Sequence, residues 1–386
     1  MKKPAYALLT TLIVVLAIPA MSQTLVVGTC KKSNHHYTTI QSAVQAAPED
    51  ATVLVCPGTY AEQVVITTPL TLKGISVPPL NNPTIAGPSG GVTIGPIQPV
   101  MGGDDLASII AVDTGGTPGP VNIQGIVVDA ETACQFNGQD ITGILYVSTS
   151  GAIRDSVIQN MSPVCGDSAI WVENDDRRPM TVTAKNNIIR EIYSYGILAY
   201  SGPSSSGLSF LLQDNTFLQV GTAAVFDTNG NGVRVSGNYI GSFNDAMVVN
   251  DASIVDHNVI MTGGEAAALV ISGNGSNITG NTITIGSGST GIRIGIDDAD
   301  GTASVTWNRI TGNGQGGKGI VVSSSNVSIR SNTLGNLGNG ILVPCGDKQV
   351  SANSIFNTAV GIDGVTASES LSNNFFNVPT PQVACP

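Results

Sequence analysis

The sequence predicts an all-β protein wound as a single-stranded parallel β-helix, a solenoid in which each coil stacks on the one before it. The main observation is a repeat, in which Asn stands two residues ahead of Ile, Leu or Phe nine times at intervals of 20 to 28 residues. A period of this size across half a chain indicates stacked supersecondary units. The composition agrees, because 46 glycines and 11% charged residues are typical of a turn-rich β protein. The repeat positions are Asn187, Asn215, Asn238, Asn258, Asn281, Asn308, Asn332, Asn353 and Asn374.

Each repeat contains two short apolar segments that favour strands. One alternates ahead of the Asn, as in Val233-Arg234-Val235, and the other begins with Gly or Ala, as in Gly196-Ile197. Three short strands per coil with tight corners are typical of a parallel β-helix. We expect each repeat Asn to lie at a corner in the left-handed conformation and to bond the Asn one coil above and below. We expect one domain over residues 23–386, with irregular, loop-rich coils at 76–120 and regular coils at 121–378.

A short helix is predicted near residues 39–47, ahead of the coils. Thr38 is expected to cap it, with Gln41 reaching back, and Pro48 ends it. Ile40 and Val44 share one face of this helix, which would cover the open apolar end of the first coil.

Residues 1–22 have the features of a secretory signal peptide. Lys2 and Lys3 precede an apolar run that ends in small residues. We therefore expect a secreted or periplasmic protein without membrane insertion. Removing both lysines takes the net charge from −11 to −13 (−11 − 2), and such acidity argues against nucleic-acid partners. We expect a monomer.

Six cysteines in an exported chain indicate disulfides. Neighbouring coils lie about 4.8 Å apart, so a cysteine reaches its own coil or the next one. The nearest pairs are Cys30 with Cys56, Cys134 with Cys165, and Cys345 with Cys385.

Three segments near the N-terminus carry a family resemblance: Tyr37-Thr38-Thr39-Ile40-Gln41-Ser42-Ala43-Val44, then Val55-Cys56-Pro57-Gly58-Thr59-Tyr60-Ala61-Glu62-Gln63-Val64, then Leu70-Thr71-Leu72-Lys73-Gly74. Together they resemble the N-terminal signature of right-handed parallel β-helix proteins of the pectin-lyase-like superfamily. That family includes pectate lyases, pectin methylesterases, polygalacturonases and uncharacterised bacterial repeat proteins. The resemblance implies a right-handed solenoid and a partner among polysaccharides, uronate polymers included. It implies no single reaction, because the further methylesterase segments and the Gly-His-Gly of polygalacturonases are absent, and one fold hosts many chemistries.

The segment 171–179 holds the densest cluster of chemically active side chains. If Ile170 points inward, Trp171 and Glu173 point outward, beside Tyr200 and Phe226 on later coils. Aromatic rings beside carboxylates and guanidiniums suit a sugar-binding groove. The predicted substrate contacts are Trp171, Tyr200 and Phe226. The candidate catalytic groups are Glu173, Asp175, Asp176, Arg177 and Arg178, as the carboxylates of a glycosidase or the basic groups of a lyase.

Alternatives accompany each of these assignments. The charged loop is equally explained as solvated residues that pair with one another. Asp297, Asp298 and Asp300 before a glycine resemble part of a calcium loop but lack its full pattern, so no cofactor is expected unless calcium binds there. An apolar outward stripe from Leu145 to Leu342 indicates a partner, or a cover formed by loops such as 76–120.

The leading functional hypothesis is therefore an exported protein that binds or processes polysaccharide, as a lyase or glycoside hydrolase if it is an enzyme. The alternative is a non-catalytic surface or structural protein whose long face engages another extracellular macromolecule. A relative that kept only the scaffold is the third possibility.

Overall fold

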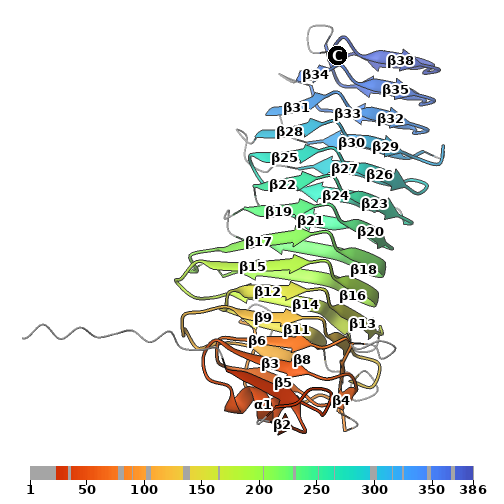
Figure 1. Ribbon diagram of the computed structural model, residues 1–386. Helices are drawn as coiled ribbons and strands as arrows, with labels where there is room; N and C mark the ends of the chain where they lie inside the picture. Colours follow the sequence, from red (N-terminus) through yellow and green to blue (C-terminus); the bar gives the residue numbers. More distant parts are fainter. Residues whose placement is uncertain are drawn as a thin grey trace, which may run out of the picture.

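The computed structural model describes residues 23–385, apart from residues 34–35, 77–81, 89, 101–105, 134–139, 164–165, 203, 229–231, 251, 265, 296–301, 315, 324–325, 346–348 and 367–369. The described residues form a parallel β-helix that rises from the N-terminal coils to the C-terminal ones (Figure 1). The predicted fold class is confirmed. The expected signal peptide lies outside the described residues.

One wall of the solenoid is a 15-stranded parallel sheet. Its strands each precede a corner of the coil, and in chain order they are β1 (Thr24–Val27), β2 (His36–Tyr37), β3 (Ala51–Val55), β6 (Leu70–Gly74), β9 (Val121–Gln124), β12 (Gly151–Arg154), β15 (Met180–Lys185), β17 (Leu208–Gln213), β19 (Val233–Ser236), β22 (Ser253–Asp256), β25 (Ser276–Thr279), β28 (Thr302–Thr306), β31 (Asn326–Arg330), β34 (Gln349–Ser351) and β37 (Ser370–Leu371).

Two further rows of parallel strands complete each coil. The second row contains β4 (Thr59–Ala61), β7 (Thr84–Ala86), β10 (Val127–Asp129), β13 (Val157–Met161), β20 (Tyr239–Ser242), β23 (Val259–Thr262), β26 (Thr282–Ile285), β29 (Arg309–Thr311), β32 (Thr333–Gly335), β35 (Ser354–Phe356) and β38 (Asn374–Phe376). The third row contains β5 (Val64–Ile66), β8 (Ala107–Val112), β11 (Ile141–Val147), β14 (Gly166–Asn174), β21 (Met247–Val249), β24 (Ala267–Ile271), β27 (Thr290–Ile294), β30 (Lys318–Val322), β33 (Asn339–Leu342), β36 (Val360–Asp363) and β39 (Thr380–Val383). The long strands β16 (Ile188–Ser201) and β18 (Thr216–Asp227) bend through both rows.

The repeat Asn side chains form a buried hydrogen-bonded ladder along one corner. In each pair, the Nδ2 of one Asn donates to the Oδ1 of the next at 2.9–3.1 Å. The same Nδ2 also donates to a backbone carbonyl of the preceding coil, such as that of Val235 for Asn258. Every rung therefore satisfies polar groups that would otherwise be buried without partners.

Two details of the predicted ladder are wrong. Its last member is Asn373, because Asn374 pairs with Ser354 as the first residue of a second-row strand. The ladder Asn was also expected to be left-handed, but at each corner the left-handed residue is the one before it, as at His257 (φ 56°) before Asn258. The ladder Asn keeps an ordinary backbone and contributes its amide alone.

The short helix α1 (Ile40–Ala46) covers the N-terminal end of the stack (Figure 1). Its N-cap is Thr39, where Thr38 was predicted, and the Thr39 hydroxyl accepts from the N–H of Ser42. The carboxylate of Glu62 accepts from the N–H groups of Ile40 and Gln41 at 2.8 and 2.9 Å. The carboxylate thus satisfies the first free amides of the helix. Gln41 bonds the backbone of Val65 instead of closing the cap.

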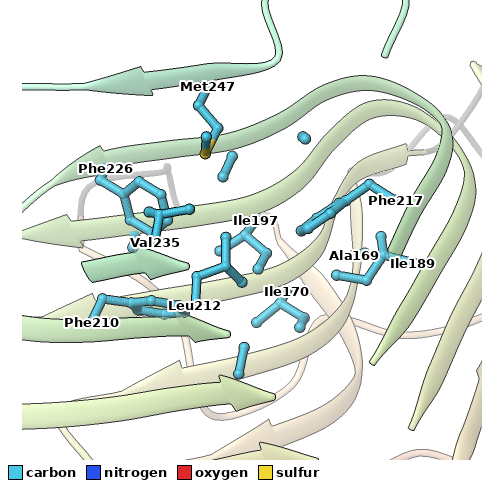
Figure 2. Close-up of a cluster of buried hydrophobic side chains, with 14 of the residues drawn as sticks. Ala169, Ile170, Ile189, Ile197, Phe210, Leu212, Phe217, Phe226, Val235 and Met247 are labelled. Atoms are coloured by element: carbon cyan, nitrogen blue, oxygen red, sulfur yellow. The ribbon is translucent and has the colours of Figure 1, made fainter. Parts of the chain in front are cut away.

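The interior is a continuous column of apolar side chains from all three rows. Phe226 lies in this column against Phe210, with ring centroids 5.2 Å apart (Figure 2). The predicted outward direction of Phe226 is therefore wrong. Its backbone neighbour is Ala199, and Leu198 pairs with Val225. Val225 takes the outward position because a one-residue change of side-chain alternation moves a residue to the other face.

Two of the three predicted disulfides are confirmed. Cys30 bonds Cys56 near the N-terminal end, and Cys345 bonds Cys385 near the C-terminal end. Cys134 and Cys165 lie outside the described residues.

Candidate functional site

The apolar outward stripe, which begins at Leu145 on the third row of strands, is covered by other residues in its first coils. Leu145, Trp171 and Leu198 stack on adjacent strands and are at most 5% exposed. Ile97 and Leu106 pack on them from the segment ahead of β8, which forms part of the same cluster. The predicted cover by residues 76–120 is therefore present over this part of the stripe. We call the described residues 92–100 and Leu106 the covering segment.

Glu173 lies beneath the covering segment. Its side chain is fully buried, and its carboxylate accepts a hydrogen bond from the N–H of Val100 at 2.8 Å. Gln98 ties the same segment to Leu106 through bonds of 2.9 and 3.2 Å. Glu173 points away from the solenoid core as predicted, and the covering segment separates it from solvent.

Tyr200 and Trp171 remain neighbours under this cover. Their ring centroids are 5.9 Å apart, and Tyr200 is half-buried. The indole N–H of Trp171 has no hydrogen-bond partner among the described residues. These two predicted sugar contacts form a closed aromatic pair in this conformation.

The charged loop after β14 reaches solvent, whereas Glu173 is buried. Asp175 and Arg177 are exposed. Arg178 pairs with Asp176, with Nε donating to Oδ2 at 2.8 Å, and also donates to the carbonyl of Gly116. This hydrogen bond from Arg178 holds the pKa of the Asp176 carboxyl below its ordinary value. A hollow of about 270 Å³ lies here between Val100 and the loop. The five candidate catalytic groups therefore do not meet in one open groove.

The proposed calcium ligands Asp297, Asp298 and Asp300 lie outside the described residues. Within the described part of the chain, no group of three or more His, Cys, Asp or Glu side chains is placed to hold a metal ion.

A different surface is open and lined by aromatic rings. It lies at the corner where the second row turns into the third, at the right-hand edge of Figure 1 where β16 and β18 bend. A hollow of about 600 Å³ there shares Gln219 and Phe243 with a second hollow of about 330 Å³. We call the two together the corner groove. Its lining residues are Glu131, Asn160, Met161, Ser162, Pro163, Glu191, Ile192, Tyr193, Leu218, Gln219, Tyr239, Gly241, Ser242, Phe243, Met261, Thr262 and Gly263.

The corner groove runs along the solenoid axis past six successive second-row strands, from the end of β10 to the end of β23. At about 4.8 Å per coil, this is a length of about 24 Å. Tyr193 is 60% exposed and Phe243 is 55% exposed. Large rings with this exposure along an elongated groove are unusual for residues whose only task is packing.

Three groove residues stack in the left-handed conformation. They are Asn160 (φ 65°), Glu191 (φ 58°) and Gln219 (φ 55°), each four positions after a ladder position. Asn enters this conformation readily, whereas Glu and Gln do so less often. Left-handed residues also stand before the ladder Asn residues, so this conformation is a regular corner feature of the coil.

The equivalent corner differs between parts of the solenoid. In the C-terminal coils these residues are all Asn, and Asn377 donates to Asn357, which in turn donates to Asn336. In the middle coils they are Ser242, Thr262, Ile285 and Gly312. Glu191 and Gln219 combine the left-handed conformation with a longer polar side chain.

Asp129 organises the N-terminal part of the groove. Its carboxylate accepts from the Nδ2 of Asn160 at 3.0 Å, from the Nε2 of Gln159 at 2.7 Å and from the N–H of Glu131 at 3.0 Å. Gln159 in turn accepts from Arg190 at 2.6 and 2.9 Å. The network fixes the backbone of Glu131 and the side chain of Asn160 at the groove.

Sequence reasoning missed the corner groove. The residue four positions after each ladder Asn varies along the chain, and Ser242, Thr262, Ile285 and Gly312 stand there in the middle coils. Alignment of the ladder alone therefore does not single out Glu191 and Gln219. Phe243 directly follows β20 and carries no sequence pattern of its own.

No protein-family model matches the chain, and no curated protein matches it. No helix in the described part of the chain is long and apolar enough to cross a membrane.

Several solved structures share the chain's architecture. The catalytic unit of a GH87 α-1,3-glucanase from Streptomyces thermodiastaticus strain HF3-3 is 14% identical with a TM-score of 0.50, over 90% of this chain and 65% of the glucanase. The N-terminal fragment of bacteriophage Phi29 gene product 12 is 13% identical with a TM-score of 0.49, over 90% and 69% of the two chains. The Streptococcus pneumoniae surface protein and adhesin PfbA is 13% identical with a TM-score of 0.41, over 89% and 94%. At 14% identity the likeness to the glucanase concerns the fold alone.

Proposed function

We propose that this chain is an exported protein that binds a polysaccharide along the corner groove. The observation that carries the proposal is the pair of exposed rings, Tyr193 and Phe243, in an open groove parallel to the solenoid axis. An extended sugar chain presents flat apolar faces at intervals and hydroxyl groups between them. Rings spaced along a groove suit those faces, and carboxylate and amide side chains suit the hydroxyls.

The polar lining supports the same proposal. Glu131, Asn160, Glu191 and Gln219 supply acceptors and donors on successive coils. The glucanase with the same fold acts on an α-1,3-glucan by its description, but the likeness concerns the fold, so the groove carries the proposal.

Export is part of the proposal. Two disulfides among the described residues fit an oxidising compartment, and the sequence predicts a signal peptide ahead of the first coil. Monomeric state and the choice between periplasm and exterior stay predictions.

Binding is tested by affinity electrophoresis of the mature protein through gels that contain neutral, amino-bearing or uronate polysaccharides. We expect retardation with at least one polymer, and an affinity about 5–10-fold weaker in Tyr193→Ala and in Phe243→Ala, since a ring contact contributes about 1 kcal/mol. Phe376→Ala is the matched control, because Phe376 is 74% exposed on the last coil, away from the groove. Equal binding by all variants, or no retardation by any polymer, would contradict the proposal.

Catalysis by Glu173, Asp175, Asp176, Arg177 or Arg178, and calcium binding by Asp297, Asp298 and Asp300, stay predictions. They are tested by incubating the protein with the same polymers, with and without calcium. New ultraviolet absorbance that is lost in Arg177→Ala or Arg178→Ala would indicate a lyase. New reducing ends that are lost in Glu173→Ala would indicate a glycosidase, provided that the variant is folded.

A further inference from the structure

The charge of the corner groove indicates which class of sugar chain it takes. We propose that the groove selects a polysaccharide whose sugars carry free amino groups, and that Glu131 and Glu191 provide this selectivity. The inference rests on the proposed function, since it names the ligand class of the same groove.

The charged side chains that line the groove are both acidic. Glu131 and Glu191 are exposed, and among the described lining residues there is no Lys or Arg. No ion pair joins either carboxylate to a cation in the described part of the chain. The nearby Arg190 is engaged by Gln159, one coil away. Two unpaired carboxylates repel a uronate chain and attract an ammonium group.

Backbone geometry places both residues at the groove. Glu191 is left-handed (φ 58°), in the column with Asn160 and Gln219. The N–H of Glu131 is fixed by the carboxylate of Asp129 at 3.0 Å. The carboxylate of Asp129 already accepts hydrogen bonds from Asn160 and Gln159. The carboxylates of Glu131 and Glu191 therefore remain to bind an ammonium group at this end of the groove.

The aromatic rings favour the same ligand. A cation close to the face of Tyr or Phe is attracted by the ring quadrupole. An amino sugar placed against Tyr193 thus gains from the ring and from the neighbouring Glu191, whereas an N-acetylated or neutral sugar gains from stacking alone. The overall net charge, −13 once Lys2 and Lys3 are removed with the predicted signal peptide (−11 − 2), adds a long-range attraction for a cationic chain.

The test is calorimetric titration with glucosamine, N-acetylglucosamine and galacturonate oligosaccharides of equal length. We expect the glucosamine chain to bind about fivefold or more tightly than the N-acetylated chain, and this advantage to disappear at about 1 M salt, where the Debye length is about 3 Å. The double variant Glu131→Gln/Glu191→Gln should lower the affinity for the glucosamine chain more than that for the N-acetylated chain, because Gln keeps a hydrogen-bond acceptor and loses the charge. Gln is tolerated in this conformation, because Gln219 already adopts it.

The outcomes separate the two proposals. Equal affinity for the amino and N-acetylated chains, or preference for galacturonate, would overturn the charge selectivity and leave polysaccharide binding intact. An amino preference that is undiminished in the folded double variant would assign the selectivity to other residues and would also overturn the inference. If no oligosaccharide binds and no polymer retards the protein, both proposals fail.

Discussion

The N–H of Val100 donates a hydrogen bond of 2.8 Å to the carboxylate of Glu173, a fully buried side chain 73 residues later in the sequence. This contact joins the covering segment to the outward stripe of the third row. It gives Glu173 a structural task at the position where the sequence suggested a catalytic one.

Replacing Glu173 by Ala should loosen the covering segment. The N–H of Val100 would lose its acceptor, which we expect to cost about 1–3 kcal/mol of local stability. Limited proteolysis and hydrogen exchange within residues 92–100 measure that opening. Glu173→Gln keeps an acceptor oxygen and should lose less. Asp175→Ala, two residues away and exposed, should stay within about 0.5 kcal/mol, and equal protection in all three variants would contradict the assignment.

The fold could be predicted because its main determinant is periodic. Each ladder Asn is followed at once by a second-row strand, so the period of the sequence is the period of the coil. For the stripe that includes Trp171, the sequence predicted only that a partner or loops such as 76–120 would cover it. It did not identify the residues that make the contact. Val100 lies in a segment without periodicity ahead of β8, and Glu173 lies in β14, two strands beyond β8 in the third row. No local sequence pattern encodes a contact between them.

The inward direction of the Phe226 side chain could not be predicted from the sequence, for a related reason. Asn187 and Asn215 are 28 residues apart, which places Phe226 opposite Leu198. At the bend of β16, however, three residue steps from Ile192 to Tyr195 match two steps in β18, so Val225 lies opposite Leu198. One extra residue at a corner is enough to reverse the alternation of a whole strand.

Truncation at positions 225 and 226 tests this register. Phe226→Ala removes a ring that is buried against Phe210, and we expect it to lower the unfolding free energy by about 3–5 kcal/mol. Val225→Ala removes two methyl groups at a half-buried outward position and should cost about 1 kcal/mol or less. Urea denaturation followed by circular dichroism gives both values. Costs in the reverse order would place Val225 in the core.

Replacing an Asn in the middle of the ladder should lower the stability of the protein, whereas replacing an exposed Asn outside the ladder should not. Asn258→Ala removes the acceptor of Asn238 and leaves the carbonyl of Val235 and the Oδ1 of Asn281 without this donor. Because these groups are buried, we expect a loss of about 2–4 kcal/mol. The control is Asn277→Ala, an exposed Asn on β25, which should change stability by less than about 0.5 kcal/mol. Similar melting temperatures for both variants would remove the ladder as a main source of stability.

The two described disulfides should each protect their own end of the solenoid. Cys345 and Cys385 are 40 residues apart in sequence, and Cys30 and Cys56 are 26 apart. Loop-closure entropy for such spans corresponds to about 3–4 kcal/mol. A solenoid coil contacts only its neighbours, so the effect of losing one crosslink should fade over a few coils.

Hydrogen exchange of single-disulfide variants tests this locality. In Cys345→Ser/Cys385→Ser, we expect faster exchange in β36 and β39 and unchanged exchange in β3 and β6. The variant Cys30→Ser/Cys56→Ser serves as the matched control and should give the opposite pattern, since Cys56 follows β3 directly. Faster exchange along the whole chain in either variant would mean that the coils unfold as one cooperative unit, in conflict with a nearest-neighbour solenoid.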